Sequence, residues 1–265
     1  MKQFITICFF ICCGFVTSFA QQVVNEAALE LLIETVLPES TGPNVNAAEG
    51  AMVLRMGDVE IKSKLFFKTG NYRLDNDMGM GKNSVIYNAP TKTTTTLMEM
   101  MGKKFGFYTN EEDIKKMQAA NDSVRERKQI QSFTPEVFIE YLSETKKIAG
   151  MLCNKAILRH KNSKGEEVQQ IVWYSPEFKL GEDFKLNSML RLANLPGLQK
   201  LKGFPMEFDM VRQNGAKVHY QVTKVNLNAK VDDKLFLIPK DYDIKAQSEM
   251  NRGGRPGEMQ FRING

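Results

Sequence analysis

Apolar residues alternate with polar ones along Val59-Glu60-Ile61-Lys62-Ser63-Lys64-Leu65-Phe66-Phe67, and this pattern sets the fold class. A period of two is typical of a β-strand with one buried face. After the turn Thr69-Gly70-Asn71 the alternation continues, with Tyr72 and Leu74 separated by charged residues. Two more short strands follow, around residues 85–87 and 93–101. Residues 51–108 are therefore predicted to form an antiparallel meander with one dry face.

The same pattern returns in the second half of the chain, at residues 137–141, 151–159 and 168–174. Gln213-Asn214-Gly215 joins two further alternating segments, and Asn-Gly at this place is a strong hairpin signal. Beyond Thr223 the apolar positions change parity, which predicts a bulge. Leu235-Phe236-Leu237-Ile238, just before Pro239, is predicted to be the strand that closes the sheet.

Helices are predicted at three places. Residues 23–37 have apolar side chains at helical spacing and end at Pro38, which predicts an N-terminal amphipathic helix. The stripe consists of Ala28, Leu31, Leu32, Thr35 and Val36, with Glu26, Glu30 and Glu34 on another face. A charged insert at 109–131 is predicted to hold a surface helix over residues 111–130, capped by Asn110. A short interrupted helix is predicted within 187–201.

The first twenty residues predict export. Lys2 precedes an apolar run from Phe4 to Val16, and small residues follow at Ser18 and Ala20. This order is typical of a secretory signal peptide, here cleaved after Ala20. We expect a periplasmic, extracellular or outer-membrane-associated protein with no transmembrane span in its mature part. Three of the four cysteines lie in the signal, so Cys153 is alone and cannot form an internal disulfide.

The composition narrows the classes of function. The 265 residues include 36 Lys and Arg against 31 Asp and Glu, a net charge of +5 that is spread along the chain. Such a weak and dispersed charge does not predict a nucleic-acid partner. With 42% hydrophobic and 25% charged residues, the chain is an ordinary globular protein, which excludes collagen, wholesale disorder and a multi-span membrane protein.

No motif predicts catalysis. Metal and acid–base sites usually need histidine, and His160 and His219 have no partner at metal-ligand spacing. Cys153 lies in an alternating segment, which favours a buried thiol over a nucleophile. Asp232-Asp233 could bind Ca²⁺ or act as an acid–base pair, but its position just before a strand favours turn capping. We expect a protein that is not an enzyme, with no catalytic residues, no metal site and no cofactor.

Methionine is unusually frequent, with fifteen residues. Met78 and Met80, and likewise Met98 and Met100, are spaced so that each pair shares a strand face. Thioethers gathered on one face could bind Cu(I), which prefers soft sulfur ligands. The alternative, favoured because no histidine or cysteine lies among them, is that these flexible side chains line an adaptable apolar cavity or core.

Four motifs occur in a recognisable order. They are Ile148-Ala149-Gly150-Met151-Leu152-Cys153-Asn154-Lys155, Val172-Trp173-Tyr174-Ser175-Pro176-Glu177, Gly203-Phe204-Pro205-Met206-Glu207 and Val231-Asp232-Asp233-Lys234-Leu235-Phe236-Leu237-Ile238-Pro239. With them the chain resembles the DUF4412 family of exported bacterial proteins, which is related to the GLPGLI family, over roughly residues 50–242. The resemblance implies a fold similar to the lipoprotein carriers LolA and LolB, a curled antiparallel sheet around helices. It implies no activity.

These observations together predict a mainly β (α+β) chain. Its parts are a signal peptide (1–20), an N-terminal helix and linker (21–45), one β-rich half-barrel domain (46–246) and a disordered tail (247–265). A curled sheet that does not close leaves a concave apolar face. Burial of an acyl chain there contributes about 0.8 kcal/mol per CH₂.

The resulting hypothesis is a non-enzymatic envelope protein that binds a hydrophobic ligand, such as a lipid or a lipoprotein acyl chain. The predicted cavity residues are Tyr72, Leu74, Met78, Met80, Met98 and Met100. The alternative is a structural or protein-interaction module whose sheet interior is filled by its own side chains. In that case the charged insert and the tail contact a protein partner in the envelope.

Overall fold

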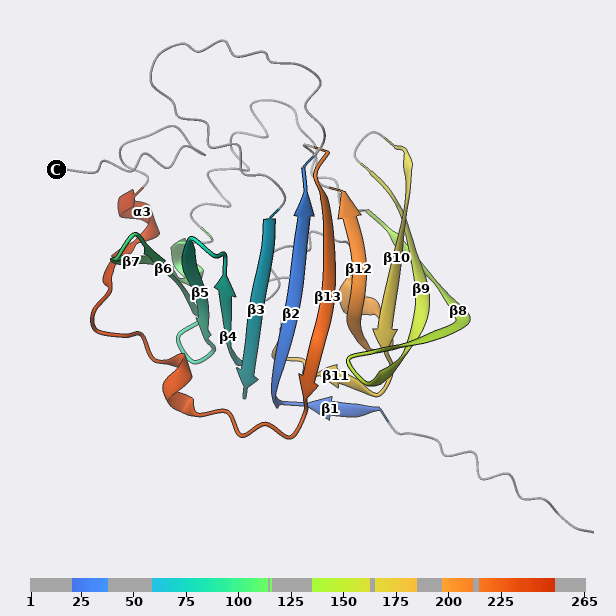
Figure 1. Cartoon of the computed structure of the whole chain (residues 1–265), viewed down its shortest axis with the longest axis horizontal. Coiled ribbons are helices and arrows are strands. Elements are labelled where there is room, and N and C mark those ends of the chain that lie inside the picture. The colour runs from blue at the N-terminus through green and yellow to red at the C-terminus, as the bar shows by residue number, and fades with distance from the viewer. Residues whose placement is uncertain are drawn as a thin grey trace, which may run out of the picture.

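The computed structural model of the chain describes residues 21–37, 59–113, 115, 135–162, 165–184, 197–211 and 215–250. Within these residues, twelve strands form one large sheet and two further strands form a small parallel pair. The strands lie across the large sheet in the order β14 (Asp243–Ala246), β7 (Lys103–Thr109), β6 (Thr93–Met100), β5 (Gly81–Asn88), β4 (Asn71–Asp77), β3 (Val59–Lys68), β2 (Glu26–Val36), β13 (Lys217–Asn226), β12 (Phe204–Val211), β10 (Glu167–Ser175), β9 (Met151–Lys161) and β8 (Val137–Ile148) (Figure 1). The mainly β class predicted from the alternating segments is confirmed.

Most neighbouring strands in the large sheet are antiparallel, as predicted. The meander from β3 to β7 pairs each strand with the next one in the chain, and so do the pairs β8–β9, β9–β10 and β12–β13. The register between β13 and β2 shifts between Val222 and Lys224, which is the bulge that the change of parity predicts. Among the described strands of this sheet, β14 alone runs parallel to its neighbour, β7.

The N-terminal helix predicted at residues 23–37 is wrong. This segment forms β1 (Gln22–Val24) and then β2, which pairs with β3 on one side and β13 on the other. Ala27, Leu29, Leu31, Ile33 and Thr35 are its buried residues, so its period is two rather than 3.6. The apolar residues of this segment fit a helical period of 3.6 as well as a strand period of two. The segment is extended because the two flanking strands satisfy its backbone hydrogen bonds.

One face of the large sheet carries the main hydrophobic core. Side chains that oppose each other across antiparallel strands share a face, and such a row runs from Leu29 through Leu65 and Leu74 to Val85. These four side chains belong to one buried cluster that also contains Phe208 and Tyr220 from the other half of the sheet. We call the face that carries this cluster the inner face, and the opposite one the outer face.

The small parallel pair closes one end of the inner face. It joins β1 to β11 (Phe178–Leu180), with Gln22 opposite Phe178, and lies below the large sheet in Figure 1. Phe178 stacks on Phe204 of β12 with ring centroids 5.0 Å apart, and Val24 joins the same cluster.

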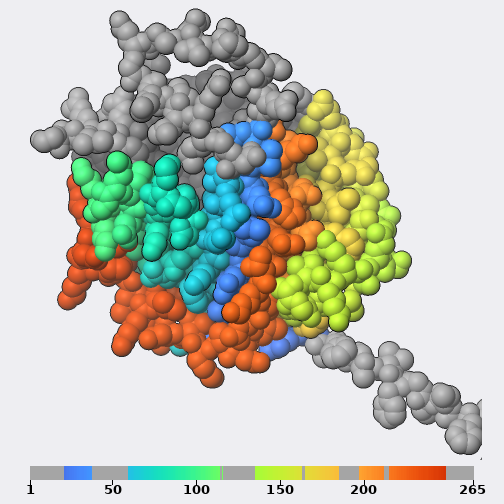
Figure 2. Space-filling view, in the orientation of Figure 1, coloured from blue at the N-terminus to red at the C-terminus, as the bar shows by residue number. Residues whose placement is uncertain are grey.

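The C-terminal segment lies against the outer face. Val231 and Phe236 form a second buried cluster with Ile86 of β5 and Leu97 of β6. In the space-filling view this part of the chain follows the lower left border of the early strands (Figure 2). The chain ends its described course in the edge strand β14 and the short helix α3 (Gln247–Met250).

The closing strand predicted at Leu235–Ile238 is also wrong. Residues 233–236 form the short 3₁₀-helix η2 (Asp233–Phe236), and Leu237 and Ile238 are exposed. Asp232 starts this turn, because its carboxylate accepts a hydrogen bond from the Lys234 N–H at 2.9 Å. The strand that closes this edge of the sheet is β14.

Several predicted segments lie wholly or partly outside the described residues. The signal peptide, the linker after Leu37 and residues 185–196 are among them, and the helix predicted within 187–201 is described only as the 3₁₀-helix η1 (Leu198–Lys200). Of the charged insert, residues 111–113 and 115 are helical, and the Asp113 N–H donates to Asn110 Oδ1 at 2.8 Å, as predicted for a cap. Of the predicted tail, only Gln247–Met250 is described, and it is helical.

Candidate functional site

The six predicted cavity residues lie at different depths of the sheet. Tyr72 and Leu74 are buried in the main cluster, and the Tyr72 ring stacks on Tyr87 with centroids 5.3 Å apart. Met98 is half-buried, whereas Met78, Met80 and Met100 are exposed near hairpin turns. None of the six lines either of the two hollows described below, so the ligand cavity at these residues stays a prediction.

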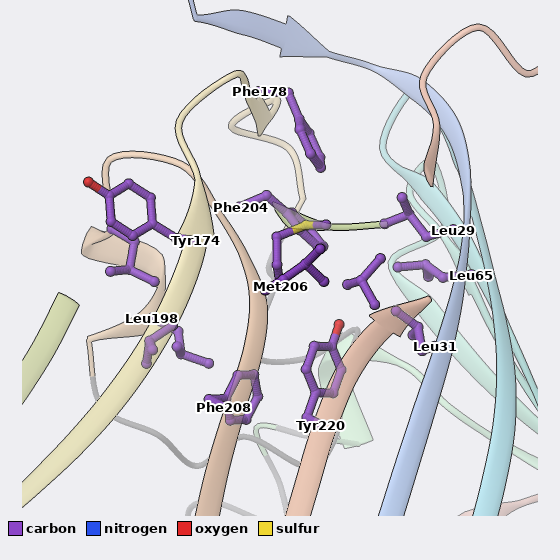
Figure 3. Close-up of a cluster of buried hydrophobic side chains, with 14 of the residues drawn as sticks. Leu29, Leu31, Leu65, Tyr174, Phe178, Leu198, Phe204, Met206, Phe208 and Tyr220 are labelled. Atoms are coloured by element: carbon purple, nitrogen blue, oxygen red, sulfur yellow. The ribbon is translucent and has the colours of Figure 1, made fainter. Parts of the chain in front are cut away.

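Tyr220, on β13, places a hydroxyl group inside the main cluster. The residue is 0% exposed, and its ring stacks on Phe208 with the centroids 4.5 Å apart. The hydroxyl points into the cluster on the side of Met206 and Leu31 (Figure 3). Among the described residues it has no hydrogen-bond partner. Burial raises the pKa of Tyr220 far above its ordinary value, so the hydroxyl keeps its proton and remains a donor.

Thr96 of β6 has a second buried hydroxyl of this kind. It opposes Val85, which places it on the inner face, and its Oγ1 has no hydrogen-bond partner within the described part of the chain. Leaving such a group unpaired in an apolar surrounding costs about 1–3 kcal/mol. Tyr220 and Thr96 therefore each bury a hydroxyl group that has no hydrogen-bond partner among the described residues.

A hollow of about 800 Å³ opens at the end of β2, β3, β12 and β13. Thr35, Val59, Met210 and Val218 are among its lining residues and form one cross-strand row of the inner face. The next row inward contains Tyr220, two residues further along β13, which is roughly 7 Å. The hollow has the size of a typical small-molecule site.

A second hollow, of about 730 Å³, lies beside the C-terminal segment. Outer-face charges of both signs line it, including Lys62, Lys64, Arg73, Asp75 and Glu99. Arg73 Nε contacts Asp75 Oδ1 at 2.7 Å, and the Ser84 hydroxyl donates to the same oxygen at 2.6 Å. Because the lining charges are of both signs and partly paired with each other, this hollow favours neither an anionic nor a cationic ligand.

The motif Val231 to Pro239 attaches the C-terminal segment to the sheet. The Val231 N–H donates to Glu26 Oε1 at 2.7 Å, and Lys68 Nζ lies 2.8 Å from Asp233 Oδ1. Arg73 donates to the carbonyl of Leu235 at 3.0 Å. The predicted turn capping is confirmed for Asp232, whereas Asp233 pairs with Lys68, and the motif has a structural role.

Three other motifs meet on the outer face at Trp173. This residue opposes Lys155 on β9 and Glu207 on β12. Lys146 Nζ lies 4.5 Å from the centroid of the Trp173 ring and 2.5 Å from Glu207 Oε1. Gln221 of β13 donates to the other carboxylate oxygen of Glu207 at 3.1 Å. These contacts fasten β8, β10, β12 and β13 together by a cation–π contact and an ion pair.

Cys153 is not placed for nucleophilic chemistry. It is fully buried, and its burial raises the pKa of the thiol to about 11. A nucleophile must be a thiolate, and at neutral pH this thiol stays protonated. His160 lies on the same strand, seven residues away, which separates the two side chains by roughly 23 Å.

Cys153 should therefore react very slowly with Ellman's reagent at pH 8. In a chain carrying Cys8→Ser, Cys12→Ser and Cys13→Ser, we expect native Cys153 to react about a hundredfold or more slowly than in guanidinium chloride. The reason is that both burial and the raised pKa of the thiol suppress attack. Similar native and unfolded rates, followed by absorbance, would show that this thiol is accessible.

His219 and His160 are half-buried. His219 Nδ1 lies 2.6 Å from Asp209 Oδ1, and both residues line the hollow at the end of β12 and β13. Among the described residues there is no group of three or more His, Cys, Asp and Glu side chains that could hold a metal ion. No helix in the described ranges is long and apolar enough to cross a bilayer.

Tyr220 was not among the site residues predicted from the sequence. The alternation Val218, Tyr220, Val222 shows direction only. The missing partner of the hydroxyl depends on Phe208, Met206 and Leu31, which come from other strands. The sequence signal that pointed to a buried Tyr220 hydroxyl was the position of this tyrosine between two valines of the same strand face.

Comparison with solved structures found similarities at low sequence identity, among them the following two. PNGF-II, in its C2 crystal form, is 14% identical with a TM-score of 0.35; the match covers 84% of this chain and 32% of that one. The chain thus spans about a third of that protein. A domain described as an outer membrane lipoprotein-sorting protein, from Vibrio parahaemolyticus, is 13% identical with a TM-score of 0.22, over 82% of this chain and 91% of that one. No curated protein matches the chain.

A family match covers most of the chain. Residues 49–242 match the family described as "Domain of unknown function (DUF4412)". This range contains the described strands from β3 to β13 and the motif that attaches the C-terminal segment to the outer face. The resemblance carried by the four sequence motifs is confirmed, and the chain belongs to the DUF4412 family.

Proposed function

We propose that this protein is a non-enzymatic binding protein of the cell envelope that holds a lipid or another hydrophobic ligand against the inner face of its sheet. The observation that carries the proposal is the Tyr220 hydroxyl, buried in an apolar cluster and without a hydrogen-bond partner among the described residues. A hydrophobic ligand with one acceptor atom, such as the carboxylate or ester carbonyl of an acyl chain, would satisfy this donor.

The surroundings of Tyr220 suit the apolar part of such a ligand. Phe208, Met206 and Leu31 lie around it (Figure 3). Burial of a ligand methylene contributes about 0.8 kcal/mol, so an acyl chain gains most of its affinity from length. Met206 is unbranched and flexible, which lets the cluster adapt to a guest. The hollow at the end of β12 and β13 lies one row from Tyr220 and offers the route of entry.

The proposal includes a sheet that curves around its inner face as a half-barrel. Supporting this, the main cluster takes side chains from β4 and β5 as well as from β10, β12 and β13. Tyr72 and Leu74 belong to that same cluster, and Thr96 adds on this face a second hydroxyl that no described residue pairs with. A long ligand would therefore meet these residues as well as Tyr220.

Export and the absence of catalysis are part of the same proposal. The charged start, apolar run and small residues of the first twenty positions support a signal peptide and an envelope location. The raised pKa of Cys153 supports a role without nucleophilic chemistry. A protein partner in the envelope, which would deliver or accept the ligand, fits a carrier of this kind.

Tyr220→Phe tests the proposal. We expect this variant to bind a fatty acid labelled at its methyl end about tenfold more weakly than the wild-type chain, because one hydrogen bond to a charged acceptor is lost. The ligand-free variant should at the same time gain about 1 kcal/mol in free energy of unfolding, because an unpaired buried hydroxyl is removed. Fluorescence titration and urea denaturation measure the two effects.

Tyr242→Phe is the matched control, since Tyr242 packs on the outer face in the second cluster. It should leave probe binding unchanged. If Tyr220→Phe binds the probe like the wild type, the hydroxyl does not hold the ligand. If the wild-type chain takes up no probe, the alternative of a sheet interior filled by its own side chains stands.

A further inference from the structure

We infer that Met78, Met98 and Met100, at one corner of the sheet, form a binding site for a soft monovalent metal ion, in the first place Cu(I). This site lies on β4–β6 and goes beyond the proposed ligand site at Tyr220 on β13. The inference rests on the cross-strand row around Gly81, on the exposure of the methionines and on the position of the neighbouring carboxylates.

Met78 and Met100 stand on either side of Gly81. The Met78 N–H donates to the Gly81 carbonyl at 3.0 Å, and Gly81 opposes Met100 in the ladder between β5 and β6. The two methionines are thus separated by two strand spacings, about 10 Å, which two unbranched thioether side chains can span.

Glycine at position 81 leaves the space between them open. A Cβ built there would lie 3.7 Å from Met100 Cγ and 2.8 Å from the Glu99 carbonyl oxygen. Met100 Cγ thus lies at van der Waals distance from that Cβ position, beside the space that Gly81 leaves open. The row presents two thioethers with a gap between them.

Met98 adds a third thioether to this corner. It is two residues from Met100 on β6 and therefore on the same, inner face, with Asn83 and Phe105 opposite it. Two positions along a strand span roughly 7 Å, so the three methionines lie at one corner of the inner face. Met80 lies in the turn just before Gly81 and is exposed.

Exposure argues that three of these methionines are not here for packing, whereas Met98 is half-buried. Met78, Met80 and Met100 are 38%, 73% and 47% exposed, and Met101 in the next turn is 91% exposed. The sequence favoured a cavity or core role because methionine fills apolar gaps. Side chains with this much exposure fill no gap, which removes the reason for preferring that role over soft-metal binding.

The hard ligands nearby are turned away or engaged. Glu99 lies between Met98 and Met100 on the strand, so it faces the outer side, between Lys82 and Lys104. Asp77 Oδ1 accepts a hydrogen bond from the Gly79 N–H at 3.0 Å. The corner thus offers thioether sulfur rather than carboxylate oxygen, a donor set that selects Cu(I) over Zn²⁺ and other harder ions.

A competition titration tests the site. The full chain carries Cys8→Ser, Cys12→Ser and Cys13→Ser, so that buried Cys153 is its one remaining thiol. Cu(I), kept reduced with ascorbate, is partitioned between the protein and a coloured Cu(I) chelator. We expect the protein to hold Cu(I), and Met78→Leu/Met98→Leu/Met100→Leu to weaken binding on the order of tenfold or more.

The matched control is Met206→Leu/Met210→Leu, which removes two thioethers from β12 in the other half of the sheet. It should hold Cu(I) like its parent, and thermal unfolding of both variants shows that they are folded. Equal Cu(I) affinity in the triple variant and its parent would overturn the inference, as would Zn²⁺ binding of similar strength. Loss of Cu(I) from all three chains to the chelator would overturn it too.

Discussion

Leu29→Ala should lower the free energy of unfolding by about 2–5 kcal/mol, whereas Leu32→Ala should cost about 1 kcal/mol or less. Leu29 is 1% exposed in the main cluster, where its removal leaves a cavity that the neighbouring strands cannot close. Leu32 is half-buried on the opposite face, beside the charged hollow. The two substitutions remove the same atoms, so the difference between them reports the face of the strand.

The test is sharp because the helical interpretation of residues 23–37 orders these two leucines the other way. In a helix Leu32 belongs to the apolar stripe and Leu29 does not. Urea denaturation of both variants, with the wild-type slope against denaturant retained, gives the two free energies. A larger cost for Leu32→Ala would mean that the segment is not the central strand β2.

The alternating segments were predictable because each carries its own evidence. Along β4, β13 and the first part of β3, charged or polar residues separate the apolar ones at every second position. This parity also assigned Tyr72 and Leu74 to the buried face. A strand with one face in solvent has polar residues at alternate positions, so its own sequence identifies it.

β2 was not predictable in this way because its outer face is also partly apolar. Ala28 and Leu32 follow Ala27 and Leu31, so apolar residues occur at both periods. Only the pairing with β3 and β13, from distant parts of the chain, decides between helix and strand. The C-terminal segment is a similar case, since its anchors Glu26, Lys68 and Arg73 lie more than 150 residues earlier.

The candidate sites show the same limit. Parity directs the Tyr220 side chain inward, but whether a described residue pairs with its hydroxyl depends on which side chains other strands bring there. For the methionines, spacing placed Met98 and Met100 on one face. Met100 is more exposed than Met98 because it is the last residue of β6, where the pairing with the neighbouring strands ends.

Gly203→Ala is expected to lower the free energy of unfolding by about 3 kcal/mol or more. A Cβ at this position would lie 2.0 Å from the carbonyl oxygen of Ser175 and 2.8 Å from its carbonyl carbon. Both are backbone atoms, so no change of rotamer relieves the contact. Ser175 opposes Phe204, the residue after Gly203, and the clash would therefore separate β10 from β12 where they join.

Gly165→Ala is the control for the loss of a glycine as such. Gly165 has a positive φ of 82°, and a Cβ there would have no atom within 4 Å. Its substitution should cost about 1–2 kcal/mol, from backbone strain alone. Denaturation curves of both variants give the two losses in free energy of unfolding. Equal losses would refute the steric reason for the glycine at position 203. A larger loss at Gly203 would mean that close packing of β10 on β12 requires glycine as the first residue of the motif Gly203-Phe204-Pro205-Met206-Glu207. Gly203 would then have a structural role, in contrast to Met206 of the same motif, which lies beside Tyr220 at the proposed ligand site.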